Sequence, residues 1–397
     1  MQIYECVLSL ISGIGVFILA MKLLRDSLKE IAGEKMKILL KKITGNRIKG
    51  VLIGALVTGV VQSSAVTTLL VIGFVNVNIM DLYQAAAIII GANIGTTSTG
   101  LLASLESLNI SLYLSLFCFI GVMLAFIKKI IKVANLLIGL GMIFVGLNLM
   151  TSSCDNDSIK SCFKKVFEKI SFPLLLELLG VIFTAILQSS SAMTALVIVM
   201  ISNQAINIQN ALFIILGANI GSCVTALIGI IGANNNSKRT AIIHLTFNIL
   251  GCSIFTPILW IFTDGIISIL RALVSKEGMQ IAIFHLFFNC ITAIIMTPFI
   301  KFLVKFSELI IKDKEKGNIL EKLIVNDDDI GDVIRNDDST NTSVENNEDF
   351  KEEKKNENNN EVDEKNINIY DVNNNSDDDE EDDDKNKETI LVKSINN

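Results

Sequence analysis

The stretch "ILQSSSAMTALV" at residues 186–197 places a run of amide and hydroxyl side chains inside an apolar segment. Gln188 is followed by Ser189, Ser190 and Ser191, and the flanks on both sides are apolar. A soluble helix keeps such residues at a cap or on a wet face. The stretch therefore predicts a polar site in a nonpolar environment, and the rest of the chain is interpreted from it.

This stretch has a counterpart earlier in the chain. "TGVVQSSAVTTLLVI" at 58–72 matches "TAILQSSSAMTALVI" at 184–198, a shift of 126 residues. The same shift relates "GANIG" at 91–95 to 217–221, and "GIG" at 13–15 to "GLG" at 139–141. Three landmarks in one register indicate an internal duplication. The first repeat is predicted over 1–138, and the second, with the closing transmembrane helices, over 139–311.

Composition separates a membrane part from a polar tail. The mean hydropathy is +0.53, and several apolar runs reach about the 20 residues that cross a bilayer: 3–21, 211–232, 240–262 and 279–300. Residues 312–397 carry 12 Lys and Arg against 28 Asp and Glu, a net charge of -16, whereas residues 1–311 carry +9. We expect an all-α polytopic membrane protein with an acidic, Asn-rich tail. The tail is expected to be disordered over 326–397 because it has too little apolar surface to offset its ordering entropy, and residues 312–325 to extend the last helix.

The basic residues orient the membrane part. Nine Lys and Arg fall within 22–49, which places this segment and the tail on the cytoplasmic side. Three crossings then separate the repeats, at 85–104, 110–127 and 133–150. An odd number of crossings inverts the second repeat relative to the first. Residues 50–80 and 172–207 must each enter and leave on one side, so we expect re-entrant hairpins with polar tips, and inverted repeats of this kind are typical of secondary transporters.

The polar tips have the chemistry of an ion site. A helix that begins within a membrane leaves backbone N–H groups unpaired, and these attract anions. Hydroxyl and amide oxygens also suit a hard cation such as Na⁺. We expect no Lys or Arg near either tip, so neutral donors, helix ends and a co-bound cation are expected to hold the anion. The alternative is that these residues only cap or join helices. The candidate residues are Gln62, Ser63, Ser64, Gln188, Ser189, Ser190 and Ser191.

The "GANIG" copies allow two interpretations. The side chains of Asn93, Thr96, Asn219 and Ser222 can offer oxygens to an ion. The glycines instead suggest tight helix packing.

Three ionisable residues lie in apolar segments. His244 and His285 open a shorter repeat, "HLTFN" and "HLFFN", for which a proton relay or packing between helices is expected. Glu177 is either a functional acid or a residue near water at the start of its segment.

The segment from "MKLLRDSLKEIAG" to "ALVTGVVQSSAVTTLLVIGFVN", followed by "GANIGTT", resembles the sodium/phosphate cotransporter family, the type II group with its bacterial relatives. The resemblance covers roughly residues 10–300. It implies Na⁺-coupled transport of inorganic phosphate, with the Gln-Ser segments as hairpin tips that bind phosphate and Na⁺. Thr67, Thr68 and Thr194, one turn further on, are added as candidates. The first copy departs from the family pattern at Ala65, which lacks the third hydroxyl.

Cys154 and Cys162 lie in the loop placed outside. The family has a disulfide in the corresponding region, so the resemblance implies that this pair is bonded, provided that the compartment is oxidising.

We therefore predict a multi-pass protein of the cell membrane that transports inorganic phosphate with Na⁺ as coupling ion. Its partners are phosphate, Na⁺ and membrane lipid; neither a resident cofactor nor a nucleic acid is expected. Two alternatives stay open: a phosphate exporter or carrier of another small anion, and a membrane sensor or scaffold whose tail recruits a partner. An enzyme is not expected, because the serine clusters have no nearby base and no metal-ligand spacing occurs.

Overall fold

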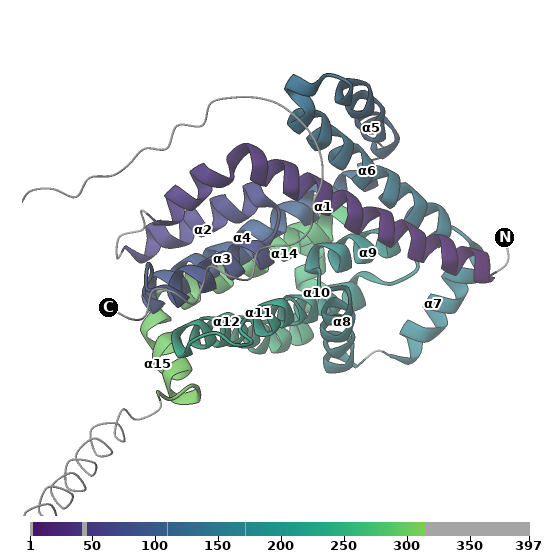
Figure 1. Ribbon diagram of the computed structural model, residues 1–397. Coiled ribbons are helices and arrows are strands. Elements are labelled where there is room, and N and C mark those ends of the chain that lie inside the picture. The colour runs from purple at the N-terminus through teal and green to yellow at the C-terminus, as the bar shows by residue number, and fades with distance from the viewer. Residues whose placement is uncertain (1–2, 42–45, 109, 171, 314–397) are drawn as a thin grey trace, which may run out of the picture. The chain divides into compact units, whose positions relative to one another are not determined.

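The computed structural model describes residues 3–41, 46–108, 110–170 and 172–313, and this part of the chain is helical, without strands (Figure 1). The longer helices are α1 (Ile3–Lys41), α4 (Leu82–Ser104), α6 (Ile131–Cys154), α12 (Asn235–Ile261) and α14 (Glu277–Met296). The shorter helices are α2 (Arg47–Val61), α3 (Ser64–Asn76), α5 (Ser111–Ala125), α7 (Asp157–Lys169), α8 (Pro173–Leu187), α9 (Ser190–Ser202), α10 (Ile208–Gly221), α11 (Cys223–Gly229), α13 (Thr263–Leu273) and α15 (Ile300–Ile310). Short 3-10 turns are η1 (Leu105–Leu108), η2 (Lys128–Ile130) and η3 (Thr297–Phe299). The all-α prediction is confirmed.

Within the described residues, six helical stretches are long and apolar enough to cross a membrane, which confirms a polytopic membrane protein. They are Tyr4–Lys41, Leu82–Ser104, Lys128–Cys154, Ile208–Gly229, Asn235–Ile261 and Glu277–Ile310. The crossing expected at 110–127 differs, because α5 has only 15 residues and extends about 22 Å at 1.5 Å per residue. That is less than the roughly 30 Å hydrocarbon core of a bilayer. The sidedness of the helices stays a prediction.

The duplication appears as a repeated succession of elements. In the first copy, α2 ends at Val61, a tight turn follows, and α3 leads into α4. In the second copy, α8 ends at Leu187, the same kind of turn follows, and α9 leads into α10. Each pair of short helices joined by such a turn is called a hairpin below, and its re-entrant placement in a membrane stays a prediction. Helix α6 spans the predicted boundary between residues 138 and 139, so the limits of the two repeats stay predictions.

Glycines set the position of each hairpin against the helix that follows it. A Cβ atom at Gly91 of α4 would lie 1.9 Å from the Val51 carbonyl oxygen of α2. A Cβ atom at the matching Gly217 of α10 would lie 1.9 Å from the Glu177 carbonyl oxygen of α8. No side chain fits at such separations, so the backbones touch directly. The glycines of "GANIG" therefore serve tight packing, as one of the two interpretations expected.

The two hairpins belong to separate hydrophobic clusters. The first cluster surrounds α2, α3 and α4 and includes Ile88 and Ile89, which are fully buried. The second surrounds α9 and α10 and includes Leu212 and Phe213, also fully buried. Helix α1 packs along α6 and joins the second cluster through residues such as Phe17. Each tip is thus held by a core of its own, and α1 connects them.

The described chain ends just after α15. Arg239 of α12 forms an ion pair with Asp313 at 3.0 Å and donates to the Ile311 carbonyl at 3.0 Å. The predictions for the tail, a helical extension over 312–325 and disorder over 326–397, lie outside the described residues apart from residues 312 and 313.

Candidate functional site

The two hairpin turns have the same backbone geometry. Gln62 lies at φ 56° and ψ 30°, and Gln188 lies at φ 50° and ψ 27°, so both occupy the left-handed region. The next residue in each turn is extended and caps the following helix: Ser63 Oγ accepts from Val66 N at 3.3 Å, and Ser189 Oγ accepts from Ala192 N at 3.2 Å. A left-handed residue other than glycine costs about 1–2 kcal/mol. Such strain gathers at functional sites, and here it recurs in both copies.

The two tips line one cavity. Its walls consist of hydroxyl and amide side chains from both repeats, one methyl group and one guanidinium group: Gln62, Ser63, Ser64, Ala65, Gln188, Ser189, Ser190, Ser191, Ser222, Thr225 and Arg25. The cavity has a volume of about 40 Å³. Sites for drug-sized molecules measure about 300–1,000 Å³, whereas a single water needs roughly 10–15 Å³ on the same kind of measure. The space therefore suits a small ion or a few waters.

Gln62 is tied into its own repeat. Its Nε2 atom donates to Ser98 Oγ at 2.8 Å and to the Gly59 carbonyl, and its Oε1 atom accepts from Thr99 Oγ1 at 3.0 Å. The partner Ser98 corresponds to Val224 after the shift of 126 residues, and a valine offers no hydrogen bond. Within the described part of the chain, the Gln188 side chain makes no hydrogen bond. The two tips therefore have the same backbone geometry, but the side-chain amide of Gln62 is hydrogen-bonded within its repeat and that of Gln188, among the described residues, is not.

The predicted threonines lie behind the tips and do not line the cavity. Thr67 Oγ1 accepts from Thr58 at 2.9 Å and donates to the Ser63 carbonyl at 3.2 Å. The Thr68 and Thr194 hydroxyls are buried and have no hydrogen-bond partner among the described residues. These three residues support the helices α3 and α9 and do not face the cavity.

Most of the "GANIG" candidates also lie outside the cavity. Asn93 Nδ2 donates to the Ile89 carbonyl at 2.9 Å, and Thr96 Oγ1 donates to the Ala92 carbonyl at 2.9 Å, so both bond within α4. Ser222 is the exception. It lies between α10 and α11, where the second copy is interrupted, and it lines the cavity together with Thr225.

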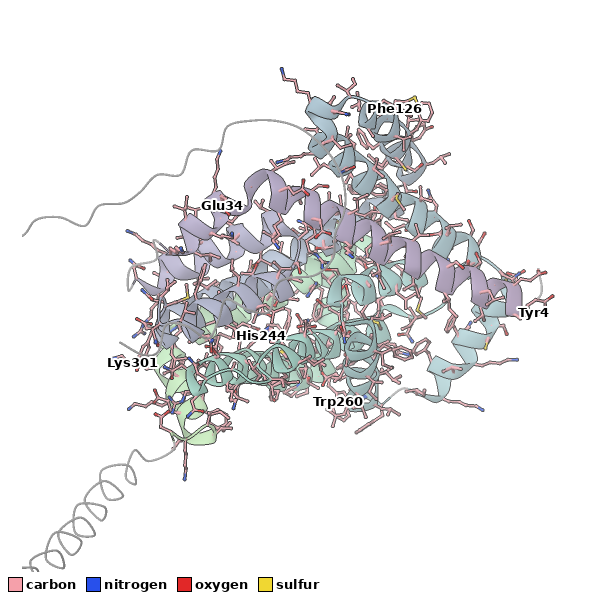
Figure 2. The ribbon with its side chains drawn as sticks, viewed as in Figure 1. Tyr4, Glu34, Phe126, His244, Trp260 and Lys301 are labelled. Atoms are coloured by element: carbon pink, nitrogen blue, oxygen red, sulfur yellow. The ribbon has the colours of Figure 1, made fainter. Side chains whose placement is uncertain are left out.

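Asn219 takes part in a buried polar contact between helices. Its Nδ2 donates to the Ile215 carbonyl at 2.8 Å, and its Oδ1 lies 3.2 Å from His285 Nε2 and 3.4 Å from Asn289 Nδ2. His285 thus joins α14 to α10, in agreement with the interpretation that polar residues bond across helices. His244 is buried on α12 (Figure 2) and its ring nitrogens have no partner among the described residues.

Glu177 lies away from the cavity. It is 8% exposed on α8, and its Oε1 accepts a hydrogen bond from Thr256 Oγ1 of α12. The position corresponds to Val51 in the first copy. The carboxyl group therefore joins the second hairpin to α12, a contact that the first hairpin cannot make with a valine.

Arg25 is the functional candidate that sequence reasoning missed. It lies on α1, 37 residues before Gln62, and it lines the cavity with both tips. The expectation that no Lys or Arg lies near the tips is therefore wrong. The error has a physical cause: α1 approaches the tips through packing against distant segments, which spacing along the chain does not reveal. Arg25 was counted only among the nine basic residues that mark the cytoplasmic side.

The implied disulfide is not present. Cys154 and Cys162 are both free thiols. Cys154 is fully buried at the end of α6, whereas Cys162 is exposed on α7. Because one side chain points into the helix packing and the other faces outward, the two sulfurs do not meet. In the described residues, no group of three or more His, Cys, Asp or Glu is arranged to hold a metal ion.

Comparison with known proteins gives the family. The family model described as Na⁺/Pi-cotransporter matches residues 16–152 and 157–295. YjbB of Salmonella typhimurium, named for a proposed role in inorganic phosphate export, is 27% identical over 311 residues, which is 77% of this chain and 56% of YjbB. YqeW of Bacillus subtilis, named as uncharacterised, is 27% identical over 302 residues, 75% of this chain and 96% of YqeW.

A human relative matches a shorter region. Sodium-dependent phosphate transport protein 2B of Homo sapiens is 32% identical over 122 residues, 26% of this chain and 18% of that protein. No solved structure matches. The chain spans about half the length of the relatives named for phosphate export. The family match covers most of both repeats, including both hairpin tips. The chain belongs to the Na⁺/Pi-cotransporter family, a family of membrane transporters and not of enzymes.

Proposed function

We propose that this protein is a secondary active transporter that couples the movement of inorganic phosphate to Na⁺, with the cavity between the hairpin tips as its substrate site. The observation that carries the proposal is that both Gln-Ser tips, 126 residues apart in the sequence, line one small cavity. Family membership supports phosphate and Na⁺ as the solutes.

The chemistry of the cavity supports a small oxyanion. Helices α3 and α9 both begin at the cavity, with Ser63 and Ser189 as N-caps. Their N-termini carry partial positive charge and present N–H groups suited to an anion. The hydroxyls of Ser64, Ser190 and Ser191 add donors for the anion, and the same hydroxyl oxygens suit a hard cation such as Na⁺. One cavity can thus hold an anion and its coupling ion together.

We propose further that each hairpin enters the membrane without crossing it, from opposite sides. The lengths support this, because α2 has 15 residues and α3 has 13, about 22 Å and 20 Å against a core of roughly 30 Å. Exposed apolar side chains such as Leu112 and Phe126 are proposed to face lipid. Alternating exposure of the cavity to the two sides of the cell membrane, with the tail in the cytoplasm, would carry substrate across.

Outward movement of phosphate is the second candidate function. The match to YjbB covers 77% of this chain, far more than the match to the human sodium-dependent protein. The cavity that we propose as the substrate site is compatible with either direction of transport.

Radiolabelled phosphate flux in proteoliposomes tests the proposal. Purified full-length protein is reconstituted, and a Na⁺ gradient is imposed inward, outward or not at all. We expect flux that follows the Na⁺ gradient, and we expect Gln188→Ala and Ser189→Ala to abolish it. Ser115→Ala is the matched control, since Ser115 is a half-buried serine on α5 that bonds only to the Leu112 carbonyl. The proposal is refuted if inserted wild-type protein moves no phosphate under any gradient.

A further inference from the structure

Arg25 is a partly buried cation on α1, a few residues after the apolar run 3–21 of this helix. It lies in the candidate span Tyr4–Lys41, is half-buried, and lines the cavity between the tips. Among the described residues, no carboxylate forms an ion pair with its guanidinium group, and its Nε atom is buried without a hydrogen-bond partner. Burying a charged group is costly unless the group is paired or hydrogen-bonded.

The nearest carboxylate, Asp26, acts on Arg25 only at longer range and forms no ion pair with it among the described residues. Asp26 follows Arg25 on α1, and its side chain is exposed. The other ten residues that line the cavity are neutral: glutamines, serines, a threonine and an alanine. Among the described residues, Arg25 is therefore the only charged side chain on the cavity wall, and no carboxylate on that wall provides a counter-charge. An anion in the cavity would be that counter-charge.

The first tip has fewer polar groups to offer than the second. Ala65 replaces the third serine of the motif, which is Ser191 in the second copy. The amide of Gln62 is already bonded within its own repeat, whereas the amide of Gln188 has no such bonds among the described residues. An anion in the cavity therefore finds most of its uncharged donors on the second tip. The guanidinium group of Arg25 offers hydrogen-bond donors to the cavity, where the first tip lacks the hydroxyl at Ala65 and its Gln62 amide is already bonded.

We infer that Arg25 is a specificity-determining residue that binds the transported oxyanion directly and supplies one fixed positive charge in the cavity. This inference rests on the proposed function and names the ligand class, a tetrahedral oxyanion that carries more than one acceptor oxygen. A guanidinium group presents a planar fork of donors that bonds two oxygens of a phosphate at once. Arginine stays protonated at all physiological pH values. The charge stays with the protein, so it replaces one cation that would otherwise accompany phosphate.

Three variants of the full chain test the inference in proteoliposomes and in detergent-purified protein. Arg25→Gln removes the charge, Arg25→Lys keeps the charge and loses the fork, and Lys22→Gln is the matched control on the same helix, where Lys22 is exposed. The measurements are KM and maximal rate for inorganic phosphate at several Na⁺ concentrations, and phosphate binding by calorimetry. Membrane insertion is measured for every variant.

We expect Arg25→Gln to raise the phosphate KM and Kd by about 10- to 100-fold, the loss typical of a hydrogen bond to a charged group. The maximal rate is expected to fall much less, and the Na⁺ dependence of KM to become steeper because a mobile cation must replace the fixed one. Arg25→Lys is expected to raise KM by about 3- to 10-fold, since a point charge does not reproduce the fork. Lys22→Gln is expected to match wild type.

The outcomes separate this inference from the proposed function. If wild type transports phosphate and Arg25→Gln has the same KM and Na⁺ dependence, the inference is overturned and the proposed function stands. If Arg25→Gln does not insert, a wild-type KM in Arg25→Lys overturns the inference in its place. If wild type neither binds nor transports phosphate, the proposed function and the inference fall together.

Discussion

Replacing Gly217 by alanine tests whether the second hairpin is positioned by direct backbone contact. The new methyl carbon would lie 1.9 Å from the Glu177 carbonyl oxygen, and ordinary contact begins near 3.4 Å. Helices α8 and α10 must therefore separate locally by about 1.5 Å, from 1.9 to 3.4 Å. The nearby atoms are backbone, so no flexible side chain can move aside. We expect a loss of about 2–3 kcal/mol in the free energy of unfolding, at the upper end of the usual cost of overpacking.

The single tryptophan makes the displacement visible. Trp260, on α12 (Figure 2), packs edge to face against Phe172, which directly precedes α8, with ring centroids 5.6 Å apart. Reversible unfolding of purified protein in denaturing detergent, followed by Trp260 emission, measures both the stability and the local contact. Gly217→Ala is expected to shift the native emission as well as the midpoint. Phosphate flux is expected to fall, because α8 carries the second tip.

Gly73→Ala is the matched control. Gly73 lies on the exposed face of α3, and a Cβ atom there meets nothing within 4 Å. Alanine is the better helix former by about 0.5–1 kcal/mol, so this variant is expected to be slightly more stable than wild type. The packing argument is refuted if Gly217→Ala unfolds within about 0.5 kcal/mol of wild type, the range of a neutral surface change, with unchanged Trp260 emission.

Three further predictions concern the tips, the thiols and a carboxyl group. Gln62→Ala is expected to cost about 1–3 kcal/mol of stability, because it leaves the Thr99 hydroxyl without its acceptor and removes the bond from Gln62 to Ser98, which keeps only its bond to the Gly95 carbonyl. Gln188→Ala is expected to abolish phosphate flux and leave stability unchanged. Equal stability losses in the unfolding assay would contradict this difference. Maleimide is expected to label Cys162 but not Cys154 in the intact protein, and to label both in the denatured protein without reductant. Mass spectrometry of the labelled peptides measures this. If labelling of the denatured protein requires reductant, the two cysteines are bonded. Burial raises the pKa of Glu106, in η1 outside the spans, above its usual 4.5, opposed by the hydroxyls of Thr151 and Ser202. The folded state then holds this proton more tightly than the unfolded state, so the stability that the group contributes is full below pH 4.5 and is lost as the pH rises through the raised pKa. The Glu106→Gln variant stays neutral and is expected to lose less stability as the pH rises from 4.5 through the raised pKa of Glu106. If the variant and the wild type show the same dependence of stability on pH, the raised pKa of Glu106 is contradicted.

The local structure of the tips could be predicted from a few neighbouring residues. The capping of α3 by Ser63 follows from the sequence, because serine is a favoured N-cap residue, whereas the left-handed conformation of Gln62 is a finding of the structure. Both features depend on atoms within about four residues along the chain. The register of 126 residues then predicts the same turn at Gln188, and the structure has it with nearly the same φ and ψ.

Residues that depend on long-range packing could not be assigned in this way. The "GANIG" pattern is equally compatible with ion ligands and with backbone contact, and only the approach of α2 to Gly91 and of α8 to Gly217 distinguishes them. The sequence predicts Asn93 as an ion ligand through its side-chain oxygen, yet Asn93 is not among the residues that line the cavity, and its Nδ2 atom donates to the preceding turn of α4. The disulfide that the resemblance implies is also not formed, because Cys154 is buried and Cys162 is exposed, and both are free thiols in the structure.

The sequence by itself determined that this chain is an all-helical membrane protein built from a duplicated hairpin, because hydropathy and capping act over short distances along the chain. Only the tertiary structure decided which side chains share the cavity. The packing of α1 brings Arg25 to the two tips. Gln62 forms a hydrogen bond with Ser98, whereas the corresponding residue of the second copy is Val224, and the Gln188 side chain has no hydrogen bond among the described residues. These contacts join residues that lie tens to hundreds of positions apart in the sequence. Their geometry depends on how closely the helices that carry these residues pack against one another.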